Sequence, residues 1–422
     1  MKKSNAKAWI GFLVVALAQG IMFRVPYLKN VFYTPMQEAF NLTNTQIGLM
    51  MTFYSTTKII TYIPAGMLAD RLDGRKALTL AISMLTILTV WYSFGPSFQV
   101  LCLIQVLLGL ANVLQVTAQV KVIRTFGNMI GQGKAFGTAE LIRGVASLGI
   151  NFLALGVYAA VEVTSDTPMR PVLLIYAATY AIMAILAWFL CPKEEKQETT
   201  EARKVVLSDY VKALKMPAVW VFAFLTMAAY SVQVINDYTT PYLTNVMGMG
   251  AVLAGAIGTI RSYGISLFSG PLFGWYNDKK KSYSRTLIGV FIAQLIVGAA
   301  LIITPADPGM VGIGVALILL GAIGIYGFNA TQWAIQAELD IPIELSSTVA
   351  GIVCVIGYTP DIFMSLLIGT KLDNTPGAEA YKSVFVYILV FAAIALIMSV
   401  IINRMAKRNA AKKAAEAVGA QS

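Results

Sequence analysis

The stretch PYLKNV, residues 26–31, occurs a second time and almost unchanged as PYLTNV, residues 241–246. The two copies are 215 residues apart in a chain of 422 residues. A second pair of related stretches has a similar offset, because GMLADRLDGRK begins at Gly66 and GWYNDKKK begins at Gly274. Landmarks that recur in the same order indicate an internal duplication, in which two halves of the chain have related structures.

The amino-acid composition predicts a membrane protein. Hydrophobic residues make up 57% of the chain and charged residues 13%, whereas a soluble globular chain is about half apolar and a quarter charged. A helix needs ~20 apolar residues to cross a bilayer, and unbroken apolar runs favour helices over the alternating strands of a barrel. We therefore expect an all-α protein with twelve transmembrane helices. The expected spans are residues 8–28, 46–69, 76–95, 98–120, 134–158, 171–191, 217–243, 252–276, 286–304, 309–336, 347–370 and 382–403.

The basic residues are distributed unevenly over the links between these spans. Of the 32 lysines and arginines, 24 lie in the N-terminal segment, in the even-numbered links or at the first residue after such a link, and in the C-terminal tail. The positive-inside rule then places both termini in the cytoplasm. The net charge of +11 is explained by this orientation and requires no nucleic acid as a partner.

The stretch GMLADRLDGRK resembles the signature that the major facilitator superfamily carries in the loop between spans 2 and 3, roughly G-x-L-a-D-R-x-G-R-K. The resemblance covers nearly the whole chain, since the repeat, the number of spans and the long central link also agree. It implies two pseudo-symmetric six-helix bundles, residues 1–191 and 217–404. A central cytoplasmic link, 192–216, joins them, and a cytoplasmic tail, 405–422, follows. It further implies a carrier that works by alternating access, with a substrate site at the midplane between the halves.

The spacing of the signature and the residues of spans 1, 5 and 7 indicate which branches of the superfamily this chain resembles. One extra residue stands between Arg71 and Gly74, a spacing similar to that of organic-anion branches such as the organophosphate antiporters. Those antiporters carry an arginine in span 1 further before the PYL motif than Arg24, and an arginine in span 7 where this chain has SVQ, residues 231–233. Span 5 lacks the Gly-Pro motif of drug–proton antiporters. Phosphate esters therefore remain one alternative, and drug or sugar efflux a weaker one.

The signature also implies a set of gating residues at the cytoplasmic side. A carboxylate at Asp70 is expected to meet the positive N-terminal end of span 11, where the family places it. Basic side chains next to it can hold carboxylates or lipid phosphates. The alternative is that these bases only keep the loop in the cytoplasm. The predicted gating residues are Asp70, Arg71, Arg75, Asp278 and Lys279.

Seven ionisable residues fall inside the expected spans, apart from three lysines that each stand at the first residue of a span. A charge in hydrocarbon costs about 2.5–3.5 kcal/mol even on a lenient scale, so such residues usually face a protein or water interior. Lys58, Arg261 and Asp361 are expected near the midplane. Arg24 and Asp237 lie higher and are candidates for a pair across the outer mouth, although Arg24 can also extend outward to the interface. Glu140 and Arg143 share one helical face and are candidates for a pair with each other.

These positions give the predicted site. The cations at Lys58 and Arg261 favour an anionic substrate, with a structural pair to Asp361 as the alternative. The predicted substrate-binding residues are Lys58, Arg261, Arg24, Tyr54, Tyr238 and Gln332. The predicted coupling residues and ion pairs are Asp361, Asp237, Glu140 and Arg143.

We therefore expect a monomeric secondary transporter of the bacterial inner membrane. Its expected substrate is a small carboxylate, sugar acid or sulfonate. We expect proton-coupled symport, with anion/anion antiport as the alternative. An ATP-driven pump is not expected, because GNMIGQGKAFG lacks the Ser/Thr and the spacing of a phosphate loop. The chain has no histidine, and its three cysteines have no metal or redox spacing. We expect neither enzymatic activity nor a cofactor or metal.

Overall fold

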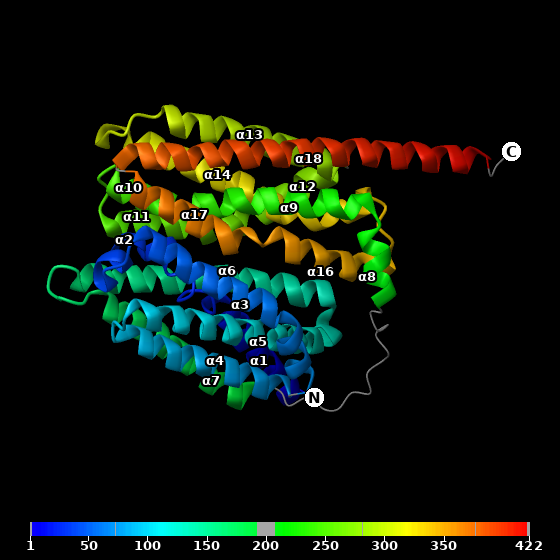
Figure 1. Ribbon diagram of the computed structural model, residues 1–422. Coiled ribbons are helices and arrows are strands. Elements are labelled where there is room, and N and C mark those ends of the chain that lie inside the picture. The colour runs from blue at the N-terminus through cyan, green and yellow to red at the C-terminus, as the bar shows by residue number, and fades with distance from the viewer. Residues whose placement is uncertain (1, 72, 192–206, 281, 376, 420–422) are drawn as a thin grey trace. The chain divides into compact units, whose positions relative to one another are not determined.

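The computed structural model describes the backbone of residues 2–71, 73–191, 207–280, 282–375 and 377–419. Every regular element in these ranges is helical. In the first half of the chain the helices are α1 (Lys2–Ile21), α2 (Lys29–Phe40), α3 (Asn44–Arg71), α4 (Gly74–Ser93), α5 (Phe98–Ile130), α6 (Gln132–Val161) and α7 (Met169–Leu190) (Figure 1). In the second half the α-helices are α8 (Leu207–Leu214), α9 (Pro217–Asn236), α10 (Thr239–Asn245), α11 (Ala251–Thr259), α12 (Ile265–Lys280), α13 (Tyr283–Ile303), α14 (Val311–Thr331), α15 (Ile335–Glu338), α16 (Ser346–Gly357), α17 (Pro360–Asn374) and α18 (Gly377–Gly419).

The lengths of the helices agree with the expected spans. Among the described residues, ten helical stretches are long and apolar enough to cross a membrane, and a shorter apolar helix covers Trp9–Ile21. Helix α3 adds 28 residues where span 2 is expected. The all-α membrane fold is thereby confirmed. The second part of the central link forms the short helix α8, while the first part of that link lies outside the described residues.

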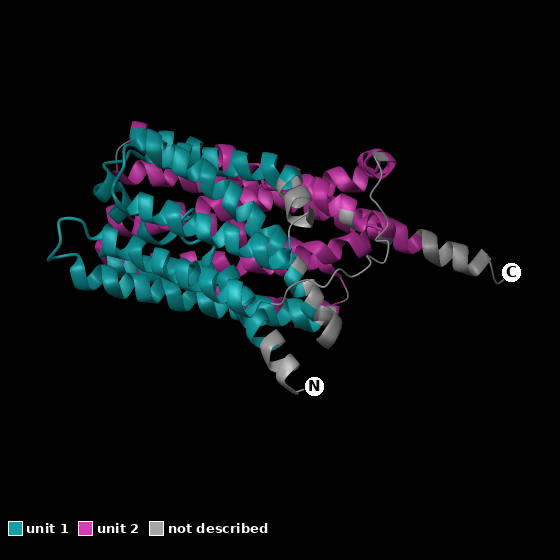
Figure 2. Cartoon of the chain, turned by 90° about the horizontal axis from the view of Figure 1, so that it is seen from below, with its two compact units in different colours: residues 1–198, 249–264, 365–373 teal, residues 199–248, 265–364, 374–422 magenta. Residues whose placement is uncertain are grey.

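The chain forms two compact units, which Figure 2 shows in different colours. Unit 1 consists of residues 1–198, 249–264 and 365–373, and unit 2 contains the rest of the chain. Unit 1 thus combines the first half of the chain with two short segments of the second half. One segment contains α11, which packs against α2 and α6, and the other is the last part of α17.

The repeated PYLxNV motif marks a break in a helix in both halves of the chain. The first expected span divides into α1 and α2, and the chain between them forms tight turns in which Arg24 N–H donates to Ile21 O at 3.0 Å. The seventh divides into α9 and α10, where Tyr238 N–H donates to Ile235 O at 3.0 Å. Both breaks lie next to a proline, which has no N–H and clashes with the preceding helical turn.

Side chains from neighbouring helices stabilise the first break. The carbonyl groups in the last turn of a helix have no partner within that helix, and lipid supplies none. The hydroxyl of Tyr180 (α7) donates to Ile21 O at 2.9 Å, and that of Ser147 (α6) donates to Gly20 O at 2.8 Å. A broken helix is tolerated at this depth because the protein satisfies the released backbone groups.

Helical structure continues past the expected end of the first span. The sequence prediction ends this span at residue 28 and places Lys29 in the link that follows. In the structure Lys29 begins α2 and is 3% exposed, and the helix continues to Phe40. The fall in hydropathy over residues 24–30 therefore includes buried polar side chains at a helix break.

Three further expected spans are interrupted, two of them near the middle and one near its end. A π-helical turn, Ile260–Gly264, lies between α11 and α12. A 3-10 turn, Gln332–Ala334, lies between α14 and α15, and two residues separate α16 from α17. Irregular backbone of this kind occurs within membranes where it is buried in protein or lines a cavity, and π-turns are frequent at functional sites.

Unit 2 has a continuous apolar core made by α9, α13, α14, α16 and α18. Phe291 and Phe328 lie in this core with their ring centroids 5.9 Å apart. Large apolar side chains on other faces are exposed, among them Ile296 on α13 and Ile397 on α18. Exposed apolar faces on helices that carry few charges are suited to contact with lipid.

Candidate functional site

Arg24 lies in the break between α1 and α2 and is almost completely buried, with 5% of its surface exposed. The centre of its guanidinium lies 3.8 Å from the centroid of the Tyr263 ring, which belongs to the π-turn and to the same unit. Within the part of the chain that the structure describes, Nε and Nη1 of Arg24 are buried and have no hydrogen-bond partner. The guanidinium is therefore covered on one face, while two of its nitrogens lack an acceptor.

Lys58, on α3, lies among aromatic rings that flank Arg24 in the sequence. Its Nζ is 5.9 Å from the ring centroids of both Phe23 and Tyr27, and 5.5 Å from that of Tyr54. It also donates to the hydroxyl of Tyr27 at 3.4 Å. The segment that contains Arg24 therefore also contacts Lys58, because the rings of Phe23 and Tyr27 lie beside the Lys58 ammonium group.

Tyr54 is fully buried and holds this aromatic group in place. Its ring meets that of Tyr27 edge to face, with centroids 5.4 Å apart. Its hydroxyl accepts a hydrogen bond from Nδ2 of Asn112 on α5 at 3.2 Å. Tyr54 thus acts on Lys58 through packing, as one wall of the space around the ammonium group.

Arg261 is the second residue of the π-turn and is 3% exposed. Its Nη2 donates to Oγ of the adjacent Ser262 at 3.1 Å. The π-turn carries Arg261 and Tyr263 two positions apart, and Tyr263 contacts Arg24. Arg24, Lys58 and Arg261 are therefore all in unit 1. The π-turn connects two of them, because it contains Arg261 and its Tyr263 contacts Arg24.

The predicted residues of unit 2 also lie at helix interruptions. Asp361 is in the first turn of α17, is 3% exposed, and accepts a hydrogen bond from the hydroxyl of Tyr230 at 2.8 Å. The ring of Tyr230 meets that of Tyr358 at 4.7 Å between centroids. A pair between Asp361 and Arg261 or Lys58 stays a prediction.

Gln332 and Tyr238 are both buried. Gln332 begins the 3-10 turn, and among the described residues its Oε1 has no hydrogen-bond partner. Tyr238 and Asp237 occupy the break between α9 and α10. The pair of Asp237 with Arg24 stays a prediction.

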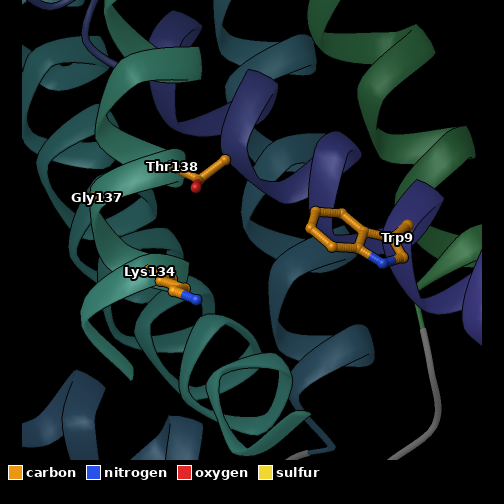
Figure 3. A pocket seen from close by; sticks show the side chains of 4 residues that line it. All are labelled: Trp9, Lys134, Gly137 and Thr138. Carbon is orange, nitrogen blue, oxygen red and sulfur yellow. The ribbon is translucent and has the colours of Figure 1, made fainter. Parts of the chain in front are cut away.

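The predicted pair of Glu140 and Arg143 is confirmed. On α6, Nε and Nη2 of Arg143 both lie 2.7 Å from Oε2 of Glu140. Sequence analysis missed a third member, Gln19 on α1, whose Nε2 donates to Oε1 of Glu140 at 2.9 Å. A cavity of about 620 Å³ lies one helical turn away and is lined by Trp9, Lys134, Gly137 and Thr138 (Figure 3).

The predicted gating residues are described only in part. The side chains of Asp70, Arg71 and Asp278 lie outside the described residues. Arg75 donates from Nη1 to Trp188 O on α7 at 3.2 Å and lies 4.8 Å from the centroid of the Trp188 ring. Lys279 lies 5.3 Å from the centroid of the Trp275 ring. Gating by these residues stays a prediction.

Comparison with known proteins agrees with this architecture. The model of the Major Facilitator Superfamily matches residues 8–359. The inner membrane protein YqcE of Escherichia coli is 28% identical over 391 residues, which cover 91% of this chain and 92% of YqcE. The inner membrane protein YihN of the same organism is 28% identical over 419 residues, covering 97% and 99%.

Solved structures show the same fold. A bacterial homolog of the human lysosomal transporter Spinster, in an inward-facing and unoccupied conformation, superimposes with a TM-score of 0.75. The match covers 95% of this chain and 98% of that protein at 16% identity. The chain is therefore a multi-pass protein of the inner membrane and belongs to the Major Facilitator Superfamily of secondary transporters.

Proposed function

We propose that this protein carries a small organic anion, such as a carboxylate, a sugar acid or a sulfonate, across the inner membrane by alternating access. The observation that carries the proposal is the buried guanidinium of Arg24, with Nε and Nη1 left without an acceptor among the described residues. An anion would supply both the charge and the hydrogen-bond acceptors that this group lacks.

The magnitudes favour a ligand for Arg24. An uncompensated buried charge destabilises a protein by about 3–5 kcal/mol. The contact with the Tyr263 ring offsets only part of this, because a desolvated cation–π contact contributes about 2 kcal/mol. Stacking uses the face of the guanidinium and leaves its N–H groups directed outward in the plane, where they can bind a carboxylate or sulfonate.

Lys58 and Arg261 supply further positive charge in the same unit, and Asp361 is the corresponding acid of unit 2. We propose proton-coupled symport, in which Asp361 exchanges a proton when the anion occupies the cations. Anion/anion antiport, including exchange of organophosphates, is the second candidate, because it needs the same cations without a titrating acid. Transport of uncharged sugars or of drugs would leave the buried cations without a role.

The proposal includes the arrangement of the chain. Residues 1–191 and 217–404 are the two six-helix bundles, residues 192–216 are the cytoplasmic link, and residues 405–422 are a cytoplasmic tail. The distribution of basic residues supports placing both ends of the chain in the cytoplasm. Both copies of the repeated motif lie in one chain, which supports a monomer as the transporting unit.

A thermal-shift experiment on the purified protein tests the proposal. D-glucuronate, isethionate and glycerol 3-phosphate represent the three kinds of anionic group, and methyl glucoside is the uncharged control. A ligand that binds the folded state raises the melting temperature, so at least one anion should stabilise the wild type and lose this effect in Arg24→Gln. The matched control is Arg170→Gln, since Arg170 is exposed in the first turn of α7. Equal stabilisation of wild type and Arg24→Gln by the anions would contradict the proposal.

A further inference from the structure

The ion pair on α6 lies deep in an expected membrane span and is nevertheless open to solvent. The side chains of Arg143 and Glu140 are 36% and 52% exposed. Arg143 is nine residues after Lys134, where the apolar stretch begins, or about 14 Å along the helix. Charged groups at such depth face water or protein instead of lipid. The exposed side of this pair therefore faces a water-filled space.

That space lies next to the cavity shown in Figure 3. Gly137 and Thr138, which line the cavity, precede the ion pair by about one turn of α6. Lys134 adds a positive charge to the cavity wall, at the end of unit 1 where α1 begins. An anion that enters from this end meets Lys134 first and Arg143 next.

Beyond the ion pair, α1 and α6 come into direct contact. Ser147 donates to Gly20 O at 2.8 Å, and a Cβ at Gly20 would lie 2.6 Å from Cβ of Ala146. Arg24 follows Gly20 by four residues. The order along this seam is therefore the cavity, the ion pair with Gln19, the close contact at Gly20, and Arg24.

From this arrangement we propose that Arg143 is a second anion-binding residue, which holds a substrate anion beside the cavity, and that Glu140 is its built-in competitor. The inference rests on the proposed function and extends it to a second position of the anion, since the close contact of α1 with α6 at Gly20 separates this position from Arg24. Glu140 occupies Arg143 through Oε2, while Gln19 holds its other oxygen. An arriving carboxylate or sulfonate takes the place of Oε2 at Arg143, and Glu140 keeps its bond to Gln19.

Competition from the Glu140 carboxylate should make the residence time of an anion at Arg143 short. An unopposed arginine would hold an anion and delay its release, whereas Glu140 restores a neutral pair when the anion leaves. The pair is half-exposed, so the exchange involves little desolvation. Arg24 differs in both respects, because it is buried and its Nε and Nη1 have no acceptor among the described residues.

Chemical modification by phenylglyoxal, an arginine-directed reagent, tests the inference. Mass spectrometry of the peptide that contains Arg143 gives the rate of its modification, with and without D-glucuronate, isethionate or glycerol 3-phosphate. In Glu140→Gln the rate should rise about two- to fivefold, the factor by which a half-exposed ion pair holds its partners. At least one anion should then slow the modification by a similar factor.

The chain offers a matched control on α18, where Lys382 and Glu379 form an exposed pair with the same spacing and a distance of 3.0 Å. Glu379→Gln should leave the reactivity of Arg143 unchanged. If Glu140→Gln does not fold, Glu140→Asp replaces it. This variant moves the carboxylate away from Arg143 by one methylene and should also raise the rate at which Arg143 is modified.

The outcomes separate this inference from the proposed function. If the anions stabilise the wild type through Arg24 but protect Arg143 in none of the variants, the role of Arg143 is wrong and the proposed function stands. If they neither stabilise the protein nor protect Arg143, both fail. Protection of Arg143 that is stronger in Glu140→Gln than in the wild type supports the competition.

Discussion

The carboxylate of Asp373, in the last turn of α17, binds the first turn of α3 at Thr45. Its Oδ2 accepts hydrogen bonds from the backbone N–H of Thr45 at 2.7 Å and from the Thr45 hydroxyl at 2.5 Å. Its Oδ1 accepts two more from Asn44, at 3.0 Å and 2.8 Å. A residue more than 300 positions away in the sequence thus caps the N-terminus of α3, where N–H groups lack helical partners and a negative charge is favoured.

Asp373→Asn should loosen this contact. Asparagine can still accept hydrogen bonds but loses the charge, and hydrogen bonds to charged groups are the stronger ones. We expect the contact between α17 and the first turn of α3 to lose about 1–2 kcal/mol of its free energy. The state in which these two helices are apart should then be about five- to thirtyfold more populated. The measurement is the rate at which a water-soluble maleimide labels a single cysteine at buried Ser365, with the native cysteines replaced by alanine. Asp307→Asn is the control, because Asp307 caps a short turn in a loop. An unchanged labelling rate in Asp373→Asn would refute this role.

Two glycines make the same contact close. A Cβ at Gly48 would collide with Ser365 O, and one at Gly369 would collide with Asn44 O. Both neighbours are backbone atoms, which cannot move aside as a flexible side chain can. Gly48→Ala and Gly369→Ala should therefore each increase labelling at position 365 more than Asp373→Asn does. Gly351→Ala on α16 is the control, since nothing lies within 4 Å of a Cβ there. Labelling of both glycine variants at the wild-type rate would contradict the prediction, because it would show that the added methyl groups do not separate α3 from α17.

Tyr263 should affect anion binding through its ring and not through its hydroxyl. The ring lies over the Arg24 guanidinium at 3.8 Å and fixes its plane. Tyr263→Phe keeps this contact and should bind the anion as the wild type does. Tyr263→Leu removes a cation–π contact of about 0.5–2 kcal/mol, so affinity should fall by about two- to thirtyfold. Titration of the thermal shift with the stabilising anion measures both. A loss in Tyr263→Phe equal to that in Tyr263→Leu would assign the effect to the hydroxyl instead.

Asp361 should couple transport to protons without being needed for exchange. Asp361→Asn keeps the shape of the side chain and an acceptor for Tyr230, but it cannot titrate. Uptake into vesicles with an acidic exterior should therefore lose its response to the proton gradient, while exchange of labelled for unlabelled anion continues. Tyr230→Phe is the comparison, because it removes the 2.8 Å hydrogen bond and keeps the acid. A gradient response that persists in Asp361→Asn would remove Asp361 from the coupling step.

The sequence was sufficient to predict the helical membrane fold because its signals are long and repeated. Twenty-residue apolar runs, the bias of Lys and Arg, and the PYLxNV repeat each extend over many residues. The pair of Glu140 and Arg143 was also predictable, because their spacing of three places both on one face of a helix. Burial of Arg24 agrees with its place in an apolar run, but its neighbours could not be read from the sequence.

The remaining features depend on backbone irregularity and on contacts between distant segments. No local pattern in IRSYG, residues 260–264, distinguishes a π-turn from an α-helix, so the contact of Tyr263 with Arg24 was not predicted. The capping of α3 by Asp373 joins residues that no periodicity relates. The start of α2 at buried Lys29 was not predicted, because a buried polar residue at a helix break has the same hydropathy as one in a loop.

Counterflow in proteoliposomes tests the central claim, that Arg24 is the residue through which this carrier binds an anion. The vesicles are loaded with the anion that stabilises the protein most, and uptake of the labelled anion is followed for the wild type, Arg24→Gln and Arg170→Gln. Each charge-assisted hydrogen bond lost at Arg24 is worth about 1.5–3 kcal/mol, so half-saturation should rise by about ten- to hundredfold per bond. We expect counterflow in the wild type and in Arg170→Gln, and its loss in Arg24→Gln at low anion concentration. Equal counterflow in all three proteins, or equal counterflow of methyl glucoside, would contradict it.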